Sequence, residues 1–495
     1  MDVAWGEPEK GDTQGLDIVG VRALDQGLEA ALANGITTIS NRGRYFTILT
    51  WAIGEFFSND MDRGAEAFDE PRFKSFLSRV EFLTLACTAL DPGKGDPGGA
   101  LGSTLYSEEV KALRSGQPVK FPTGRSGAML GAYFGPCRAI GLMRLGDGNQ
   151  TAPFVLTPRG KQVWEARGVT MGEGPWRALL WDADIVKPEQ VRDLAQHFSL
   201  KSMAHAPAEA TALQGALLTP WAPDGPAAEG VSRAYERFGQ TVDWLQRMTE
   251  AGTALRDNAL LGSALLRVVD GQTNQRIDVS WAEFEWRRRV HFALELVLSA
   301  VSGTVRDLRE ATIDEVIEDW IAQPELSERL MVWWPAAASA HTYTAEQAIA
   351  SVPPRLFLDE TPPGDIASLG PYGRALAAFA ILVCMTKNTG ALRAAGQFRR
   401  RESPGDWVMT VVESAGGEPF PDLLKAIAGI VVKAHLATTF RKMGNRQKCS
   451  LRFFPEGSRL LTTDEPTGAG RSGSRLGNVI KILEDAGVPG FGAAG

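Results

Sequence analysis

The residues best suited to chemistry form a basic cluster near the C-terminus. Between residues 425 and 459 the chain has eight basic residues and one acidic residue, Glu456, although the net charge of the whole chain is −7. The eight are Lys425, Lys433, Arg441, Lys442, Arg446, Lys448, Arg452 and Arg459, and Arg471, Arg475 and Lys481 extend the cluster. Each phosphate that such residues neutralise releases counterions, which gives salt-sensitive binding without sequence preference. We predict non-specific contacts with the phosphates of DNA from Arg441, Lys442, Arg446, Lys448, Arg452, Arg471 and Arg475.

Aromatic residues lie among these charges. Phe440, Phe453 and Phe454 are placed where they can stack on exposed bases, as in proteins that bind single strands. The alternative is that the rings belong to a core and that the charges form a solvated face or a docking surface for an acidic protein. The sequence favours nucleic acid as the partner.

Two carboxylates offer a second kind of chemistry. Asp406 and Glu413 bracket the segment DWVMTVVE, whose β-branched residues predict a strand. With Lys425 nearby, they are candidate catalytic residues of a metal-dependent nuclease, which would bind Mg²⁺. The residues directly after Glu413 are Ser-Ala-Gly, so the compact Glu-x-Lys element is missing. A nuclease with its active site in the C-terminal domain therefore remains the alternative hypothesis.

Other catalytic sets are missing from the sequence. It contains neither a GxxxxGK phosphate loop nor a GxSxG elbow, and its five histidines and four cysteines lack the spacing of zinc ligands. The cysteines, which form no CxxC pair, indicate free thiols in a reducing compartment. We expect no cofactor and no bound metal, and we favour a non-enzymatic function.

Composition indicates a soluble protein. The chain has 495 residues, 44% of them hydrophobic and 22% charged, which predicts about two to four globular domains. The N-terminus is acidic and lacks an apolar signal core. The longest apolar run, near Ala375 to Met385, is too short and too interrupted to span a bilayer. We therefore expect a cytoplasmic protein without a membrane partner.

The elements expected over residues 71–167 follow a distinctive order. Helices are predicted over Pro71–Leu90, Ser107–Leu113 and Thr123–Phe134, the last ended by Gly135-Pro136, and strands over Ala139–Leu145 and Pro153–Leu156. Gly146-Asp147-Gly148-Asn149 supplies the turn chemistry of a hairpin between the strands. Thr157 is the expected N-cap of the following helix, and Pro158 fits its first position.

This order resembles the winged-helix DNA-binding domain, in which a two-stranded wing follows the recognition helix. The resemblance implies that residues 124–134 form the recognition helix, with Arg125 and Ser126 at its N-terminal end, and that Arg144 lies on the wing. The alternative is a winged fold used for packing or for protein contact, since GRSGAMLGAYF contains little charge.

The rest of the chain is predicted to be mainly helical. Helices are expected over Ser280–Val305, Gly373–Met385, Phe420–Phe440 and Ser474–Ala486, and a second hairpin over Cys449–Phe454 and Ser458–Thr462. In the longest helix, Arg287, Arg288 and Arg289 are spread by about 100° each. We interpret them as solvated arginines that pair locally with Glu283 and Glu285.

Together these patterns predict a mainly α, multi-domain protein. The expected segments are an arm (1–40), a winged-helix-like domain (41–170), a linker region (171–230), a helical domain (231–390) and a basic α+β domain (391–495). The leading hypothesis is a DNA-binding or scaffold subunit of a bacterial multi-protein complex, in a setting such as antiviral defence or DNA maintenance. A structural subunit that binds only other protein subunits is a further alternative.

Overall fold

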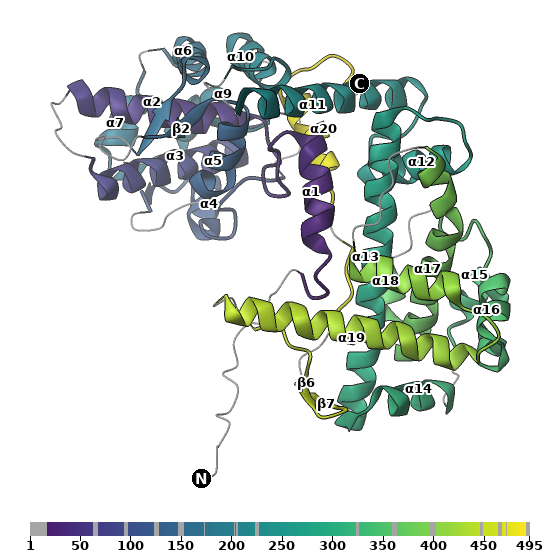
Figure 1. Cartoon of the computed structure of the whole chain (residues 1–495). Helices are drawn as coiled ribbons and strands as arrows, with labels where there is room; N and C mark the ends of the chain where they lie inside the picture. Colours follow the sequence, from purple (N-terminus) through teal and green to yellow (C-terminus); the bar gives the residue numbers. More distant parts are fainter. Residues whose placement is uncertain are drawn as a thin grey trace. The chain divides into compact units, whose positions relative to one another are not determined.

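The computed structural model is mainly helical, as predicted, and forms two compact units (Figure 1). The first unit comprises Met1–Glu29 and Arg256–Gly473, and the second comprises Ala30–Leu255 and Ser474–Gly495. The structure describes residues 17–491 except 63–67, 94–97, 123–127, 147–152, 173, 202, 204–205, 223–226, 323–325, 359–363, 396–401, 446–448, 464–467 and 472, with side chains also left out at 60–62, 227–228 and 364. Helix α1 (Arg22–Ala33) continues from the first unit into the second.

The second unit contains most of the short strands. Its helices are α2 (Arg44–Asp62), α3 (Glu70–Leu90), α4 (Ser107–Arg114), α5 (Met129–Ala139), α6 (Pro158–Met171), α7 (Trp176–Trp181), α8 (Pro188–Asp193), α9 (Ala195–Phe198), α10 (Pro207–Leu218), α11 (Ala227–Glu250) and α20 (Leu476–Asp485). Its strands are β1 (Val119–Lys120), β2 (Met143–Leu145), β3 (Phe154–Leu156) and β4 (Ile185–Val186). Strand β1 pairs with β4, and β2 pairs with β3.

The hairpin and the capped helix after it form as predicted. Strands β2 and β3 are antiparallel, with Met143 opposite Leu156. The Thr157 side chain accepts a hydrogen bond from the Gly160 N–H at 3.1 Å, and Pro158 opens α6. Gly160 is required at this point, because a Cβ there would lie 1.8 Å from the Leu142 carbonyl oxygen. The sequence Thr-Pro-Arg-Gly thus fits both the helix start and its close approach to the chain before β2.

Helix α5 differs from the prediction at its end. Gly135-Pro136 was expected to stop it, yet Pro136 lies inside the helix, which continues to Ala139. A proline removes one hydrogen bond from a helix, and here the buried packing of Pro136 and Cys137 accompanies that loss. The first strand of the hairpin is correspondingly shorter and begins at Met143.

The first unit is built around one long helix. In Figure 1, α13 (Arg276–Leu308) is the long teal helix. Four helices pack against it, namely α12 (Asp257–Val269), α17 (Pro371–Ala394), α18 (Pro404–Ser414) and α19 (Phe420–Gly444). The unit also contains α14 (Ile313–Ala322), α15 (Glu328–Trp333) and α16 (Ala345–Ser351), with 3₁₀ helices η1 (Pro335–Thr342) and η2 (Gly364–Ser368). Strands β5 (Glu310–Ala311), β7 (Arg459–Thr462) and β6 (Phe453–Glu456) form a sheet in that spatial order.

The predicted strand over Asp406–Glu413 is wrong, because this segment is helix α18. Ser403 and Asp406 form a capping box, and Pro404 occupies the first helical position. Val408, Met409 and Val412 are buried at helical spacing, whereas Trp407 is 49% exposed. The capping residues before the apolar run therefore outweigh the β propensity of its valines.

The prediction of solvated arginines on α13 is also wrong, although the predicted ion pairs form. Arg287, Arg288 and Arg289 are 4%, 2% and 0% exposed. Arg287 pairs with Glu283 at 2.9 Å, while Arg288 and Arg289 bind Glu285 at 2.7 and 2.8 Å. Because neighbouring helices cover α13 on several sides, the arginines are enclosed together with their local partners.

Candidate nucleic-acid interface

The structure separates the predicted basic cluster into residues bound internally and residues exposed to solvent. Lys425 forms an ion pair with Asp314 of α14. Arg459 pairs with Glu310 at 3.2 Å and with Glu315 at 3.3 Å. These two ends of the cluster are thus neutralised by acids that follow α13 in the sequence.

Arg471 belongs to a charge cluster in the first unit. Its guanidinium lies 3.5 Å from a Glu285 oxygen and 3.3 Å from the Asn258 side-chain oxygen. Burial, reinforced by Arg288, lowers the pKa of Arg471 to about 10. The residue was predicted to bind DNA, but its contacts are those of a structural cation.

Arg475, four positions later, belongs to the second unit. It precedes α20, and its guanidinium donates to the Ile36 carbonyl oxygen at 3.1 Å. Arg471 and Arg475 therefore do not extend one patch within one compact unit. Both make intramolecular contacts.

The C-terminal half of α19 presents a different surface. Lys433, Ala437, Phe440, Arg441 and Gly444 are exposed at spacings of four, three, one and three residues, which places them along one side of the helix. Phe440 is 49% exposed. Among the described residues, neither Lys433 nor Arg441 has an ion-pair partner. The sequence has no acidic residue between Asp422 and Glu456, so no nearby carboxylate on this segment competes for these cations.

The chain that returns from α19 adds a second exposed ring. The Thr439 and Ser450 hydroxyl oxygens lie 3.1 Å apart, and the Arg452 main-chain N–H donates to His435 Nε2 at 3.1 Å. Phe453 is buried with its ring centroid 5.3 Å from that of His435. Phe454, the next residue of the strand, points away from His435 and is 41% exposed. It therefore lies on another surface than the five exposed residues of α19, which we call the α19 patch.

The underside of this patch is held by the segment before α1. The Lys442 ammonium donates to the Asp17 carbonyl oxygen, and partial burial lowers the pKa of Lys442. His435 Nδ1 donates to the Ile18 carbonyl oxygen at 2.8 Å. Burial lowers the pKa of His435 to about 4, so its ring is neutral near pH 7 and can accept from Arg452. Lys442 and Arg452, both predicted DNA contacts, help to position the patch.

Four predicted contact residues fall outside the described residues. They are Arg125 and Ser126, before α5, and Arg446 and Lys448, after α19. Their contribution to binding remains a prediction from the sequence.

The described part of the predicted recognition helix has few exposed side chains that could contact DNA. A buried carboxylate, Glu81, accepts a hydrogen bond from the Met129 N–H at 3.0 Å at the start of α5. Gly131, Gly135 and Arg138 are the exposed residues of this helix. On the hairpin, Arg144 is exposed, and its guanidinium donates to the Leu145 carbonyl oxygen at 3.3 Å. One arginine on an otherwise glycine-rich face gives little capacity to read bases.

The residues proposed for a nuclease serve other purposes. Asp406 is buried, accepts from the Ser403 hydroxyl at 2.6 Å and lies 4.0 Å from Arg287. Glu413 is two helical turns further along α18 and pairs with Arg393 at 3.7 Å. Lys425 is bound to Asp314. Over the described part of the chain, no group of three His, Cys, Asp or Glu residues is arranged to hold a metal ion.

Two buried charge centres were not anticipated from the sequence. On α13, His291 lies 2.8 Å from Asp25 and 3.2 Å from Glu295. Burial by itself would lower the pKa of His291, but the hydrogen bonds to Asp25 and Glu295 outweigh it and raise the pKa to about 10. The i, i+4 spacing of His291 and Glu295 predicts that these two side chains can contact each other. The sequence gives no indication that Asp25, which lies 266 positions from His291, contacts it as well.

The second centre lies in the second unit and is equally enclosed. Glu209 binds Arg167 at 2.6 Å and Arg44 at 3.3 Å, and all three side chains are buried. Burial opposes the charge of Glu209, yet the two arginines lower its pKa. The three residues lie far apart in the sequence, so no local pattern predicts their contact.

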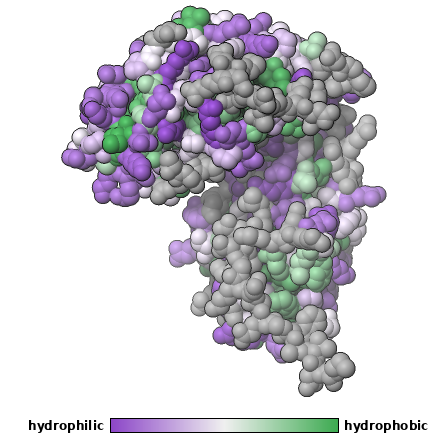
Figure 2. Space-filling view, turned by 90° about the vertical axis from the view of Figure 1, so that its left-hand side faces the viewer, coloured by the Kyte–Doolittle hydropathy of each residue, from purple (hydrophilic) through white to green (hydrophobic). Residues whose placement is uncertain are grey.

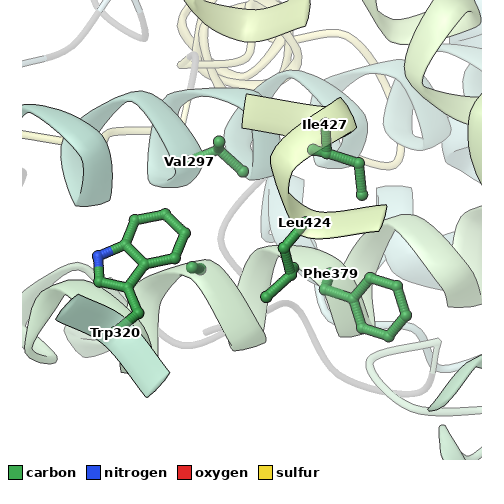
Figure 3. A pocket seen from close by; sticks show the side chains of 6 residues that line it. Val297, Trp320, Phe379, Leu424 and Ile427 are labelled. Carbon is green, nitrogen blue, oxygen red and sulfur yellow. The ribbon is translucent and has the colours of Figure 1, made fainter. Parts of the chain in front are cut away.

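Two cavities among the described residues are too small for a substrate. One has a volume of about 10 Å³ and lies between α13, α14, α17 and α19, where apolar side chains surround it (Figure 3). Its lining residues are Val297, Trp320, Ala375, Phe379, Leu424 and Ile427. Another, of about 10 Å³, lies beside His291 and Asp406. At most one water fits such a volume, so both are packing features of the core.

Two helices, α17 and α19, are long and apolar enough to cross a membrane by length and composition. Their apolar windows are 72% and 56% buried inside the protein, as in core helices of soluble proteins. On the face drawn in Figure 2, polar residues cover most of the coloured surface and apolar residues form smaller patches.

Comparisons with known proteins found no significant similarity to this chain. No protein-family model matches the chain, and neither the curated proteins nor the solved structures contain a significant match.

Proposed function

We propose that this protein binds nucleic acid through the α19 patch and acts as a non-enzymatic DNA-binding or scaffold subunit of a bacterial complex. The observation that carries the proposal is the exposure of Lys433 and Arg441 on one side of α19 without an ion-pair partner among the described residues. Arg287, Arg288 and Arg289, by contrast, are enclosed with carboxylates. Cations exposed in this way gain most from a phosphate, because they give up no existing ion pair.

The adjoining sequence supports the same partner. Residues 423–455 contain no acidic residue, so the positive potential of the patch is not cancelled within its own segment. Arg446 and Lys448, which lie outside the described residues, add two further cations to that segment. The expected binding is independent of nucleotide sequence and sensitive to salt.

The test is a charge reversal with a matched control. Lys433→Glu combined with Arg441→Glu is compared with Arg276→Glu, which changes an exposed cation at the start of α13 in the same unit. We expect the double variant to weaken binding to a DNA duplex by on the order of 10-fold in 0.1 M salt, and to flatten the dependence of log K on log salt. The Arg276→Glu variant should bind like the wild type.

The result that contradicts the proposal is equally specific. Absence of binding to any oligonucleotide, or binding whose affinity does not change with salt, would favour the structural subunit that contacts only proteins. Proteins that co-purify with the full chain would then identify its partners.

A further inference from the structure

We infer that the α19 patch binds single-stranded nucleic acid in preference to a duplex, an inference that rests on the proposed function of the patch. The observation behind it is the exposed ring of Phe440, which lies on the same side of α19 as Lys433 and Arg441, two cations that have no ion-pair partner among the described residues. A phosphate contact needs only the cations. The ring adds affinity only where a base is free to stack on it.

The position of Phe440 favours such stacking. It is seven residues after Lys433 and directly before Arg441, so a ring lies between two cations on one side of the helix. The rise of an α-helix places Lys433 and Phe440 about 10 Å apart along the axis. A backbone bound to these cations therefore carries its bases past the ring.

Phe454 is an exposed ring on another surface of the same unit. Its neighbour Phe453 is buried against His435, which lies about 200° around α19 from Lys433. Successive side chains of a strand point to opposite faces, so Phe454 faces away from α19. Phe440 is therefore the ring that lies beside the cations of the patch.

A single strand matches this combination better than a duplex does. In a duplex the base faces are stacked on one another, and the protein meets phosphates and groove edges. In a single strand every base has an accessible face, and base–aromatic stacking tolerates any sequence. The charges of the patch complement a phosphate backbone, and the ring of Phe440 complements its bases.

The experiment measures fluorescence anisotropy of the full-length protein with three probes: a 20-nucleotide oligo-dT, an abasic strand of equal length, and a 20-base-pair duplex. Phe440→Ala is expected to lower affinity for oligo-dT by about 5- to 150-fold. Phe454→Ala changes an exposed ring on another surface of the same unit and should leave this affinity unchanged. Affinity for the abasic strand should change by less than about twofold, because it has phosphates but no bases to stack. Trp407→Ala, an exposed aromatic residue of α18 in the same unit, is the matched control and should leave all three affinities unchanged.

Two conservative variants separate stacking from general apolar contact. Phe440→Trp keeps a flat ring and should retain the affinity for oligo-dT, whereas Phe440→Leu keeps apolar surface and should lose it. If Phe440→Leu binds oligo-dT like the wild type, or if vesicles containing phosphatidylserine bind the patch while oligo-dT does not, the inference is overturned.

The outcomes also distinguish this inference from the proposed function. Equal affinity for oligo-dT, the abasic strand and the duplex, unchanged by Phe440→Ala, overturns single-strand preference but leaves nucleic-acid binding intact. Failure to bind any of the three probes overturns both.

Discussion

Helices α13 and α19 both carry prominent cations, but they place them in opposite environments. On α13, Arg288 and Arg289 share Glu285 and are almost completely buried. On α19, Lys433 and Arg441 are exposed and have no ion-pair partner among the described residues. The three consecutive arginines of α13 are the denser basic run in the sequence, yet they are unavailable to a ligand.

This difference indicates that carboxylates at neighbouring helical positions determine whether a basic residue is bound within the protein or available to a ligand. Each of the three consecutive arginines of α13 has a glutamate three or four positions before it, so this part of the helix supplies its own counter-charges. The second half of α19 has none. Basic residues without acids at these spacings, on an exposed side of a helix, are the better candidates for phosphate contacts.

The largest expected effect is on stability and comes from α13. Glu285→Gln removes the carboxylate that Arg288, Arg289 and Arg471 share, and leaves buried cations without a counter-charge. We expect the free energy of unfolding to fall by about 3–5 kcal/mol. Urea denaturation followed by circular dichroism measures this. A loss below about 1 kcal/mol would mean that water reaches the cluster and that the contrast with α19 is overstated.

A second effect depends on pH. The pKa of His291 is raised to about 10, so the native protein holds a proton that the unfolded chain releases above its ordinary pKa near 6.5. The stabilisation is therefore complete below pH 6.5 and is lost as pH rises towards 10, by up to about 1.4 kcal/mol per pH unit. His291→Gln should remove this loss between pH 7 and 10 in unfolding measurements.

His435 provides the matched histidine for that experiment. Its pKa is lowered to about 4, so its contribution is present above pH 6.5 and is lost as pH falls towards 4. His435→Gln should leave the slope between pH 7 and 10 unchanged. An equal change of that slope in both variants would contradict the assignment of charged His291 and neutral His435.

The third effect concerns binding and leaves stability unchanged. Reversal of Lys433 and Arg441 should weaken DNA binding on the order of 10-fold. It should shift the free energy of unfolding by less than about 0.5 kcal/mol, because both side chains are exposed. Glu285→Gln, measured at a temperature where it is folded, should bind DNA normally. If DNA binding were lost in Glu285→Gln and retained in the double reversal, the interface would lie on α13 and the prediction would be contradicted.

The smallest effect is expected in the winged-helix-like segment. Arg138→Glu on α5 and Arg144→Glu on β2 should each change DNA affinity by less than about twofold, since the exposed face of α5 otherwise consists of Gly131 and Gly135. Anisotropy titrations measure this. A loss of DNA affinity greater than that caused by the Lys433 and Arg441 reversal would contradict this prediction. It would show that the resemblance to winged-helix domains predicts the DNA interface better than the exposed cations of α19 do.

Local chemistry predicted part of this structure well. Thr157 and Pro158 start α6, and the hairpin before them forms, because capping and turn preferences act over a few residues. The same local reasoning failed for Asp406–Glu413, where valines suggested a strand although Ser403 and Asp406 cap a helix. The identity of a capping box is a stronger signal than β propensity over eight residues.

The candidate site was predictable only in outline. The absence of acids around α19 is visible in the sequence and pointed to the correct segment for exposed cations. Which cations stay exposed depends on contacts between distant residues, such as Lys442 with Asp17 and Arg459 with Glu310. Phe453 and Phe454 differ in burial for the same reason, since strand pairing and packing against His435 decide which ring faces the core.

The most direct test is to locate the nucleic acid on the chain. An oligonucleotide that carries 5-iodouracil is bound to the full-length protein, irradiated and digested, and the cross-linked peptides are identified by mass spectrometry. The account predicts cross-links at Phe440, and their loss in the Lys433→Glu and Arg441→Glu variant. Cross-links confined to α5 and the β2–β3 hairpin would contradict it.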